Sequence, residues 1–246
     1  MSGHSKWATI KRKKGANDAQ RGKIFTKLGR ELAVAVKTGG GPDPATNSKL
    51  KDVIAKCKSN NMPNDTISRS IKKAAGEGTG ANYEENIYEG YGPNGVAVIV
   101  ETLTDNKNRT AADMRHYFDK FGGNMGQSGC VSYLFSDAGI IVIENNGFDE
   151  DEVMEDCLEA GAGDFDFQDE AIEITTEPSD LPAVRDALAA KYTILSAEVE
   201  KVPSTYVRLD DEEIAKKMSL MLEHMEDNDD VQQVWHNWEN QDEFDF

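Results

Sequence analysis

The residues best suited to binding a charged ligand lie in the first 37 positions of the chain. Four consecutive cations occupy positions 11–14, and Trp7 precedes them. Residues 20–37 have helical spacing, which places apolar residues such as Phe25 and Leu32 on one side and four cations on the other. Because each Lys or Arg that neutralises a phosphate releases condensed counterions, this pattern predicts a nucleic-acid backbone site. The predicted contacts are Lys6, Trp7, Lys11, Arg12, Lys13, Lys14, Arg21, Lys23, Lys27 and Arg30.

Two alternatives apply to this segment. The cations could form a solvated helix face that follows a frayed basic tail, because surface charge is common. Trp7 could stack on a base, or it could anchor the amino-terminal segment to the rest of the protein.

Charge is distributed very unevenly along the chain. Residues 1–75 carry a net charge of +12 and the remainder carries −30, which together give the overall −18. Separate charged poles do not cancel beyond the screening length of roughly 8 Å at physiological salt. The basic end can therefore contact phosphates while the acidic part is held away from them.

Other chemistries have little support in the sequence. The four histidines, His4, His116, His224 and His236, lack metal-ligand spacing, and the three cysteines form no C-x-x-C pair. Hydrolase, kinase and zincin signatures are missing, so we expect no enzyme activity, no catalytic residue, no metal and no cofactor. A hydrolase or transferase hidden among the many carboxylates is the less favoured alternative.

The sequence lacks the roughly 18 consecutive apolar residues of a membrane-spanning helix and the apolar core of a secretory signal. We therefore expect a cytoplasmic protein that does not contact membranes and is monomeric. A basic, acid-poor start also resembles an organelle transit peptide, but the patterned helix that follows favours a retained element.

Three basic helices are expected first. The helix over 20–37 ends at a loop of glycines and prolines, which cannot continue a helix. Asn47 is expected to cap a second helix, and Asn64 or Asp65 a third. A glycine-rich stretch at 76–81 then marks the end of the basic helical domain, residues 1–75.

The acidic remainder alternates between strand and helix patterns. Strands are expected over 86–90, 96–102, 131–135, 139–144, 164–168, 171–175, 193–201 and 231–235, and helices over 109–121, 149–160, 181–190 and 211–226. The order from residue 139 onward is that of a ferredoxin-like unit. We predict an α+β fold of three domains: the three-helix basic domain and two ferredoxin-like α/β sandwiches, one inserted in the other. Residues 131–205 form the inserted domain, and residues 81–130 with 206–240 form the discontinuous middle domain.

A second group of donors lies at the expected strand-to-helix junction near residue 105. Asn106, Asn108, Arg109 and Arg115 could contact a phosphate at the helix amino terminus. Helix capping by Asp105, Asn106 or Asn108 is the slightly favoured explanation.

Several motifs resemble the YebC family across nearly the whole chain. They are Gly3-His4-Ser5-Lys6-Trp7, Arg21-Gly22-Lys23-Ile24-Phe25-Thr26-Lys27, Asn61-Met62-Pro63, Tyr88-Glu89-Gly90-Tyr91-Gly92-Pro93, Asp105-Asn106, Asn108-Arg109-Thr110 and Asp229-Asp230-Val231-Gln232. The resemblance implies three domains and a cytoplasmic, DNA-binding transcriptional regulator. The mitochondrial relatives of this family are translational activators, which implies an alternative.

Charge pattern and resemblance together predict a non-enzymatic, nucleic-acid-binding regulator of gene expression, with DNA as its ligand. The alternative is a ribosome-associated translation factor that binds ribosomal RNA. In that case the acidic domains could contact basic ribosomal proteins or other basic partners.

Overall fold

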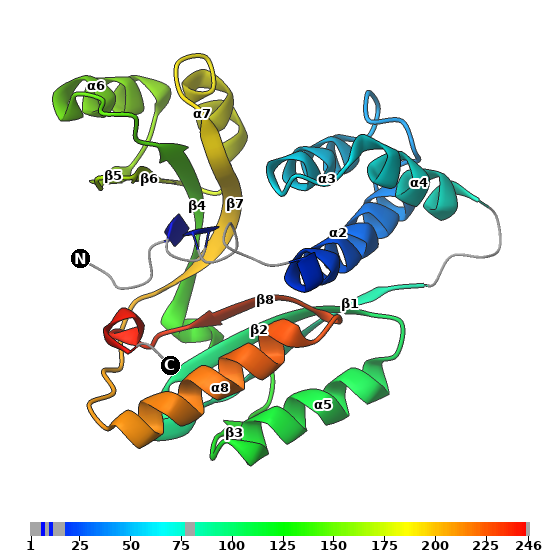
Figure 1. Cartoon of the computed structure of the whole chain (residues 1–246), viewed down its shortest axis with the longest axis vertical. Coiled ribbons are helices and arrows are strands. Elements are labelled where there is room, and N and C mark those ends of the chain that lie inside the picture. The colour runs from blue at the N-terminus through cyan, green and yellow to red at the C-terminus, as the bar shows by residue number, and fades with distance from the viewer. Residues whose placement is uncertain (1–5, 8–9, 12–17, 77–81, 245–246) are drawn as a thin grey trace. The chain divides into compact units, whose positions relative to one another are not determined.

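The protein is described by a computed structural model that covers residues 6–7, 10–11, 18–76 and 82–244 (Figure 1). The chain divides into two compact units. The main unit contains residues 16–133 and 205–246, and the insert unit contains residues 1–15 and 134–204. We call residues 6–7 and 10–11, which belong to the insert unit, the arm.

Three helices form the first part of the main unit. They are α2 (Asp18–Thr38), α3 (Ser48–Ser59) and α4 (Asn64–Ala75). Their apolar faces meet in one core, in which Leu32, Leu50 and Cys57 have no exposed surface. This shared core explains the helical spacing of apolar residues in the sequence, because an amphipathic helix gains most of its stability by burying one face.

Side-chain capping explains where the second helix begins. Asn47 accepts a hydrogen bond of 2.9 Å from the backbone N–H of Leu50, as predicted. The prediction for α4 was wrong, because Pro63 occupies its N-cap position and makes no side-chain cap bond. The Pro63 carbonyl instead accepts from the N–H groups of Thr66 and Ile67.

The rest of the main unit is a four-stranded antiparallel sheet with two helices on one face. Its strands lie in the order β3-β1-β2-β8. Met114 and Phe118 from one helix and Met218 and Met221 from the other pack on Val98 and its neighbours in the sheet. The elements are β1 (Glu84–Tyr91), β2 (Ala97–Thr104), α5 (Lys107–Lys120), β3 (Asn124–Met125), α8 (Glu212–Asp227) and β8 (Val231–His236).

The last strand of the chain completes this sheet. β8 pairs antiparallel with β2, so that Val234 lies opposite Val100. Residues 134–204, which belong to the insert unit, lie between β3 and α8 in the sequence. This pairing supports the proposal of an inserted domain within a discontinuous middle domain.

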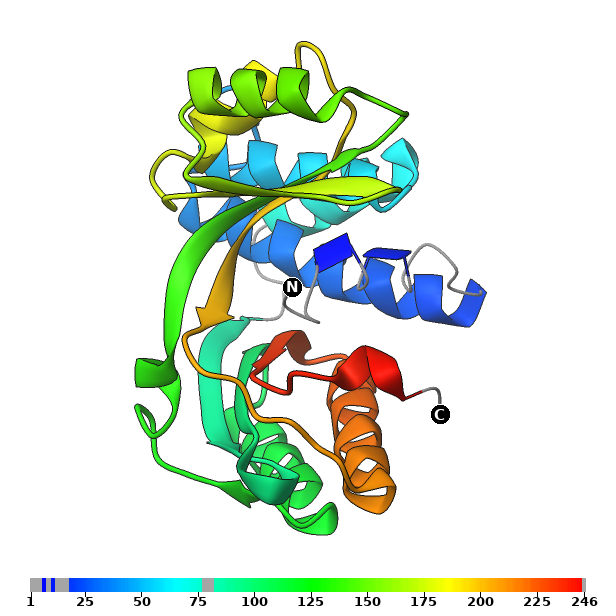
Figure 2. The same cartoon turned by 90° about the vertical axis from the view of Figure 1, so that its left-hand side faces the viewer.

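The insert unit is a second four-stranded antiparallel sheet, in the order β5-β6-β4-β7. This is the strand order of a ferredoxin-like unit, and the predicted α+β fold is confirmed. Its helices cover one face of the sheet, and the arm lies on the other face (Figure 2). The elements are β4 (Phe135–Glu144), α6 (Glu150–Ala160), β5 (Asp164–Phe167), β6 (Ala171–Thr176), α7 (Leu181–Leu188) and β7 (Ile194–Pro203).

The strand predicted over 131–135 does not form. The sequence predicts separate strands over 131–135 and 139–144, but the structure has a single strand, β4, that begins at Phe135. Residues 132–134 form a short 3-10 helix instead. The backbone N–H groups of Val131 and Ser132 bond to the Glu89 carboxylate, so they are not available to a strand ladder.

Candidate nucleic-acid interface

The predicted cationic stripe of α2 is largely engaged by the acidic part of the main unit. The Lys23 ammonium lies 2.8 Å from a carboxylate oxygen of Asp227. Lys27 donates to the backbone carbonyl of Glu226 at 2.6 Å. Arg30 donates to the carbonyl of Leu103 at 3.0 Å and pairs with Asp230. Arg21 is exposed near the start of the helix.

Asp230 is the centre of this contact. Asp230 is 3% exposed. Its carboxylate accepts hydrogen bonds from Arg30, from Arg109 at 2.8 Å and from the Thr110 hydroxyl at 2.7 Å. Burial raises the pKa of Asp230, but the hydrogen bonds from Arg109, Arg30 and Thr110 outweigh it and lower the pKa to about 2. The carboxylate is therefore ionised at neutral pH, and it joins α2 to the middle-domain sheet.

Asp230 was not among the predicted site residues. Two of the motifs that resemble the YebC family, Asn108-Arg109-Thr110 and Asp229-Asp230-Val231-Gln232, meet at this carboxylate. The signal was therefore present in the sequence, but nothing in the spacing shows that segments 120 residues apart are in contact.

The second predicted contact group mostly has a capping role. The Asn106 side chain accepts from the N–H of Arg109 at 3.1 Å, which confirms capping as the role of this residue. Arg109 is held by Asp105 at 2.9 Å and by Asp230, and these partners raise its pKa. Asn108 and Arg115 are exposed on α5. A phosphate contact by this group stays a prediction.

The arm is folded against the insert unit. Trp7 and Ile10 pack on the face of the sheet formed by Ile140, Val142 and Ala171. The Trp7 ring N–H donates to Glu170 at 3.2 Å, and the Lys11 ammonium lies 2.6 Å from the same carboxylate. Arg12, Lys13 and Lys14 lie outside the described residues.

Lys6 is largely buried in the insert unit. Its side chain is 12% exposed, and its ammonium contacts Glu198 at 2.8 Å and also Glu200. Burial alone lowers the pKa of a lysine, but the charges and hydrogen bonds of these two glutamates outweigh it, so the pKa of Lys6 is raised. The residue carries its charge, and two carboxylates accept the hydrogen bonds of its ammonium group.

The outer surface of the three helices carries a larger group of exposed cations. Eight Lys and Arg residues of the segment 18–76 are exposed: Arg21, Lys37, Lys49, Lys51, Lys58, Arg69, Lys72 and Lys73. Apart from Arg21, they were not in the predicted contact list. Helical periodicity places the α3 and α4 cations on outward faces, so the sequence contains enough information to include them.

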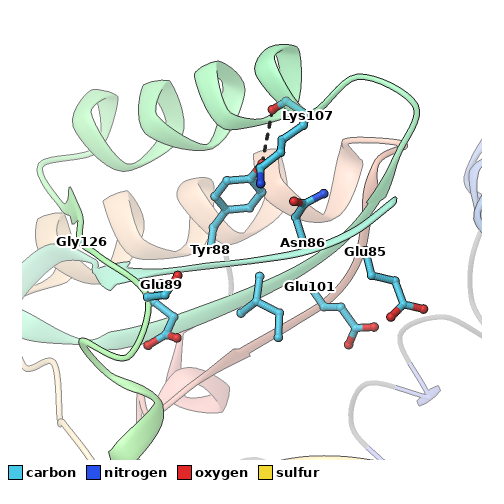
Figure 3. Close-up of a pocket in the computed structure, with 9 residues that line it drawn as sticks. Glu85, Asn86, Tyr88, Glu89, Glu101, Lys107 and Gly126 are labelled. Carbon is cyan, nitrogen blue, oxygen red and sulfur yellow. Dashed lines mark hydrogen bonds between the residues drawn. The ribbon is translucent and has the colours of Figure 1, made fainter. Parts of the chain in front are cut away.

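A concavity of about 550 Å³ in the main unit has the opposite character (Figure 3). Glu85, Glu89 and Glu101 line it together with Tyr88 and Lys107. Burial raises the pKa of Glu89, but backbone N–H groups of Gly129, Val131 and Ser132 outweigh it and hold the pKa below its usual value. Because its carboxylates outnumber Lys107, this concavity does not suit a phosphate.

Within the described ranges, no cluster of three His, Cys, Asp or Glu side chains could hold a metal ion. In the same part of the chain, every helix is too short or too polar to cross a membrane.

The fold and charge distribution define a class of α+β proteins in which a basic three-helix domain precedes acidic α/β sandwiches. Residues 5–77 match the TACO1/YebC protein N-terminal domain, and residues 83–238 match the TACO1/YebC second and third domain. The chain belongs to the TACO1/YebC family.

Relatives share nearly the full length of the chain. A "Probable transcriptional regulatory protein" from Ruminiclostridium cellulolyticum is 62% identical over 99% of this chain and 98% of its own. A protein of the same name from Finegoldia magna is 55% identical over 98% and 100%. The crystal structure of the conserved hypothetical protein Aq1575 from Aquifex aeolicus has a TM-score of 0.81 and 46% identity, and the match covers 90% of this chain and 91% of that one. The names of the two sequence relatives support a regulatory role.

Proposed function

We propose that the chain is a non-enzymatic regulator of gene expression that binds nucleic acid through its basic helical domain. The observation that carries this proposal is the surface of helices α2, α3 and α4, where eight exposed cations surround a closed apolar core. Such a cationic surface suits a phosphate backbone. The proposed contacts are the predicted cations of α2 with the exposed cations of α3 and α4 and, as a separate group, the predicted cations at positions 6 and 11–14.

Duplex DNA is the first candidate ligand, because the relatives are named as transcriptional regulators. Ribosomal RNA is the second. The accessible cations lie on all three helices and not on a single recognition helix, which favours recognition of backbone and shape over base reading. The acidic sandwiches would then be free to contact basic ribosomal proteins.

Salt dependence tests the proposed backbone contacts. If about eight phosphate contacts form on duplex DNA, four of them from the run at 11–14, the slope of log affinity against log salt should be near −7. Changing Lys11, Arg12, Lys13 and Lys14 to alanine should reduce the slope to about −3.5, because four contacts are lost. Fluorescence anisotropy with a labelled duplex at several salt concentrations measures both values.

The matched control is Lys216→Ala with Lys217→Ala, which removes two exposed cations from the acidic middle domain. Its slope should equal that of the wild type. A slope near −7 in the four-residue variant would rule out the run at 11–14 as a contact.

Sedimentation of the native protein from lysate separates the two ligands. After DNA digestion at moderate salt, a translation factor should travel with ribosomal subunits, and high salt should release it. A transcriptional regulator should stay in light fractions and should bind duplex DNA with sequence preference over competitor. Ribosome association that persists only while DNA is intact would contradict the ribosomal alternative.

A further inference from the structure

The arm contacts the insert unit through an apolar centre. Trp7 and Ile10 pack on Ile140, Val142 and Ala171. The arm lies on the face of the sheet opposite helices α6 and α7 (Figure 2). These three sheet residues are each 5% exposed or less. The arm therefore covers apolar surface that would otherwise face water, which favours the docked position.

Charged contacts surround this centre and differ in strength. The Lys6 ammonium lies between Glu198 and Glu200. The exposed fraction of the side chain is 12% for Lys6, 21% for Glu198 and 11% for Glu200. The backbone N–H of Lys6 also donates to Glu173 at 2.8 Å. The pair of Lys11 and Glu170 is more open, with 61% and 55% exposed side chains, so salt weakens it readily.

Lys6 and Lys11 pair with glutamates in the docked arm, and the proposed function assigns the same two lysines to phosphate contacts. A lysine ammonium has three N–H donors, and in Lys6 carboxylates already accept from them. Carboxylates and phosphates are both anions that accept such bonds, so the two cannot fully engage Lys6 and Lys11 at once.

We propose that the open face of the insert-unit sheet is an intramolecular docking site for the arm, and that its glutamates compete with nucleic-acid phosphates for Lys6 and Lys11. This inference rests on the proposed function. The occupant of the site is the arm, which contributes Lys6, Trp7, Ile10 and Lys11. Since only the undocked fraction binds with the arm, docking lowers the apparent affinity in proportion.

The test weakens the docking site without touching a proposed nucleic-acid contact. The full-length variant Glu198→Gln with Glu200→Gln removes the two carboxylates that hold Lys6. We expect the dissociation constant for a labelled 20-base-pair duplex, and for an RNA hairpin of equal length, to fall at least fivefold at about 150 mM salt. The control is Glu159→Gln with Glu177→Gln, which removes the same charge from exposed positions of the insert unit. It should stay within twofold of the wild type.

Displacement of the arm is measured independently in the wild-type protein. Labelling with 5-fluorotryptophan gives a resonance for each of the three tryptophans, and Trp7→Phe assigns that of Trp7. Adding the duplex or the hairpin should shift the Trp7 resonance away from its position in the free protein. This readout does not depend on whether the glutamine variants fold.

The outcomes distinguish this inference from the proposed function. If the glutamine variant and its charge-matched control bind equally tightly, and the Trp7 resonance stays in place when ligand binds, the docking site is a structural strap and the inference is overturned. If neither nucleic acid binds to any of these proteins, the proposed function fails, and the inference fails with it.

Discussion

Replacing Asp230 by alanine should lower the free energy of unfolding of the main unit by about 3–5 kcal/mol, the range found when one partner of a buried ion pair is removed. The carboxylate is almost fully buried, and its loss leaves Arg30, Arg109 and Thr110 without their shared acceptor. Arg30 is the most affected, because its side chain is 15% exposed. Urea unfolding at neutral pH, monitored by circular dichroism, measures the change.

Asp229→Ala is the matched control, because the neighbouring carboxylate is exposed. It should change the stability by no more than about 0.5 kcal/mol. If both variants lost a similarly small amount of unfolding free energy, Asp230 would not be the shared acceptor that joins α2 to the middle-domain sheet.

The pH dependence of the Asp230 effect has a defined sign. The pKa is depressed in the folded protein, from an ordinary 3.8 to about 2. The stabilisation is therefore complete above about pH 4, and it is lost as the pH falls toward 2. The difference in stability between the wild type and Asp230→Ala should shrink over this range.

Replacing Trp238 by alanine should cost about 3–5 kcal/mol, as large aromatic deletions from a core do. Trp238 has no exposed surface, and it lies in the same core as Val98, Phe118 and Met218. Its ring N–H donates to Asn240 at 3.1 Å. Because the carboxyl-terminal residues complete the middle-domain core, strands β1 and β2 should lose protection from hydrogen exchange together with them.

Tyr133→Ala provides the comparison, since Tyr133 is 72% exposed. That variant should stay within about 0.5 kcal/mol of the wild type. If Trp238→Ala exposed only residues 231–244 to exchange, the carboxyl-terminal segment would be an appendage and not part of this core.

Most helices and strands could be predicted from the sequence because their patterns are local. Helix α2 was expected over 20–37 and spans Asp18–Thr38, since its apolar spacing reflects one continuous buried face. The order of elements after residue 139 was sufficient to predict a ferredoxin-like unit. The two-residue strand β3 was missed, because so short a segment has no period to detect.

The contacts of the predicted site residues could not be predicted in this way. Lys6 pairs with Glu198 and Glu200, 192 and 194 residues away. The acidic part of the chain contains 40 carboxylates, so charge alone does not show which of them a lysine meets. Anchoring of the arm by Trp7 was one of two alternatives, and the apolar contacts with Ile140 and Val142 match it.

The pairing of β8 with β2 has a consequence for biosynthesis. The strand that completes the middle-domain sheet is translated about 130 residues after β2. At roughly 5–20 residues per second, β2 emerges from the ribosome several seconds or more before its partner. Over that interval residues 134–204 can fold, while one edge of β2 has no strand beside it. Such an edge is prone to pair with other chains, so the nascent polypeptide passes through a stage at which chaperones would protect it.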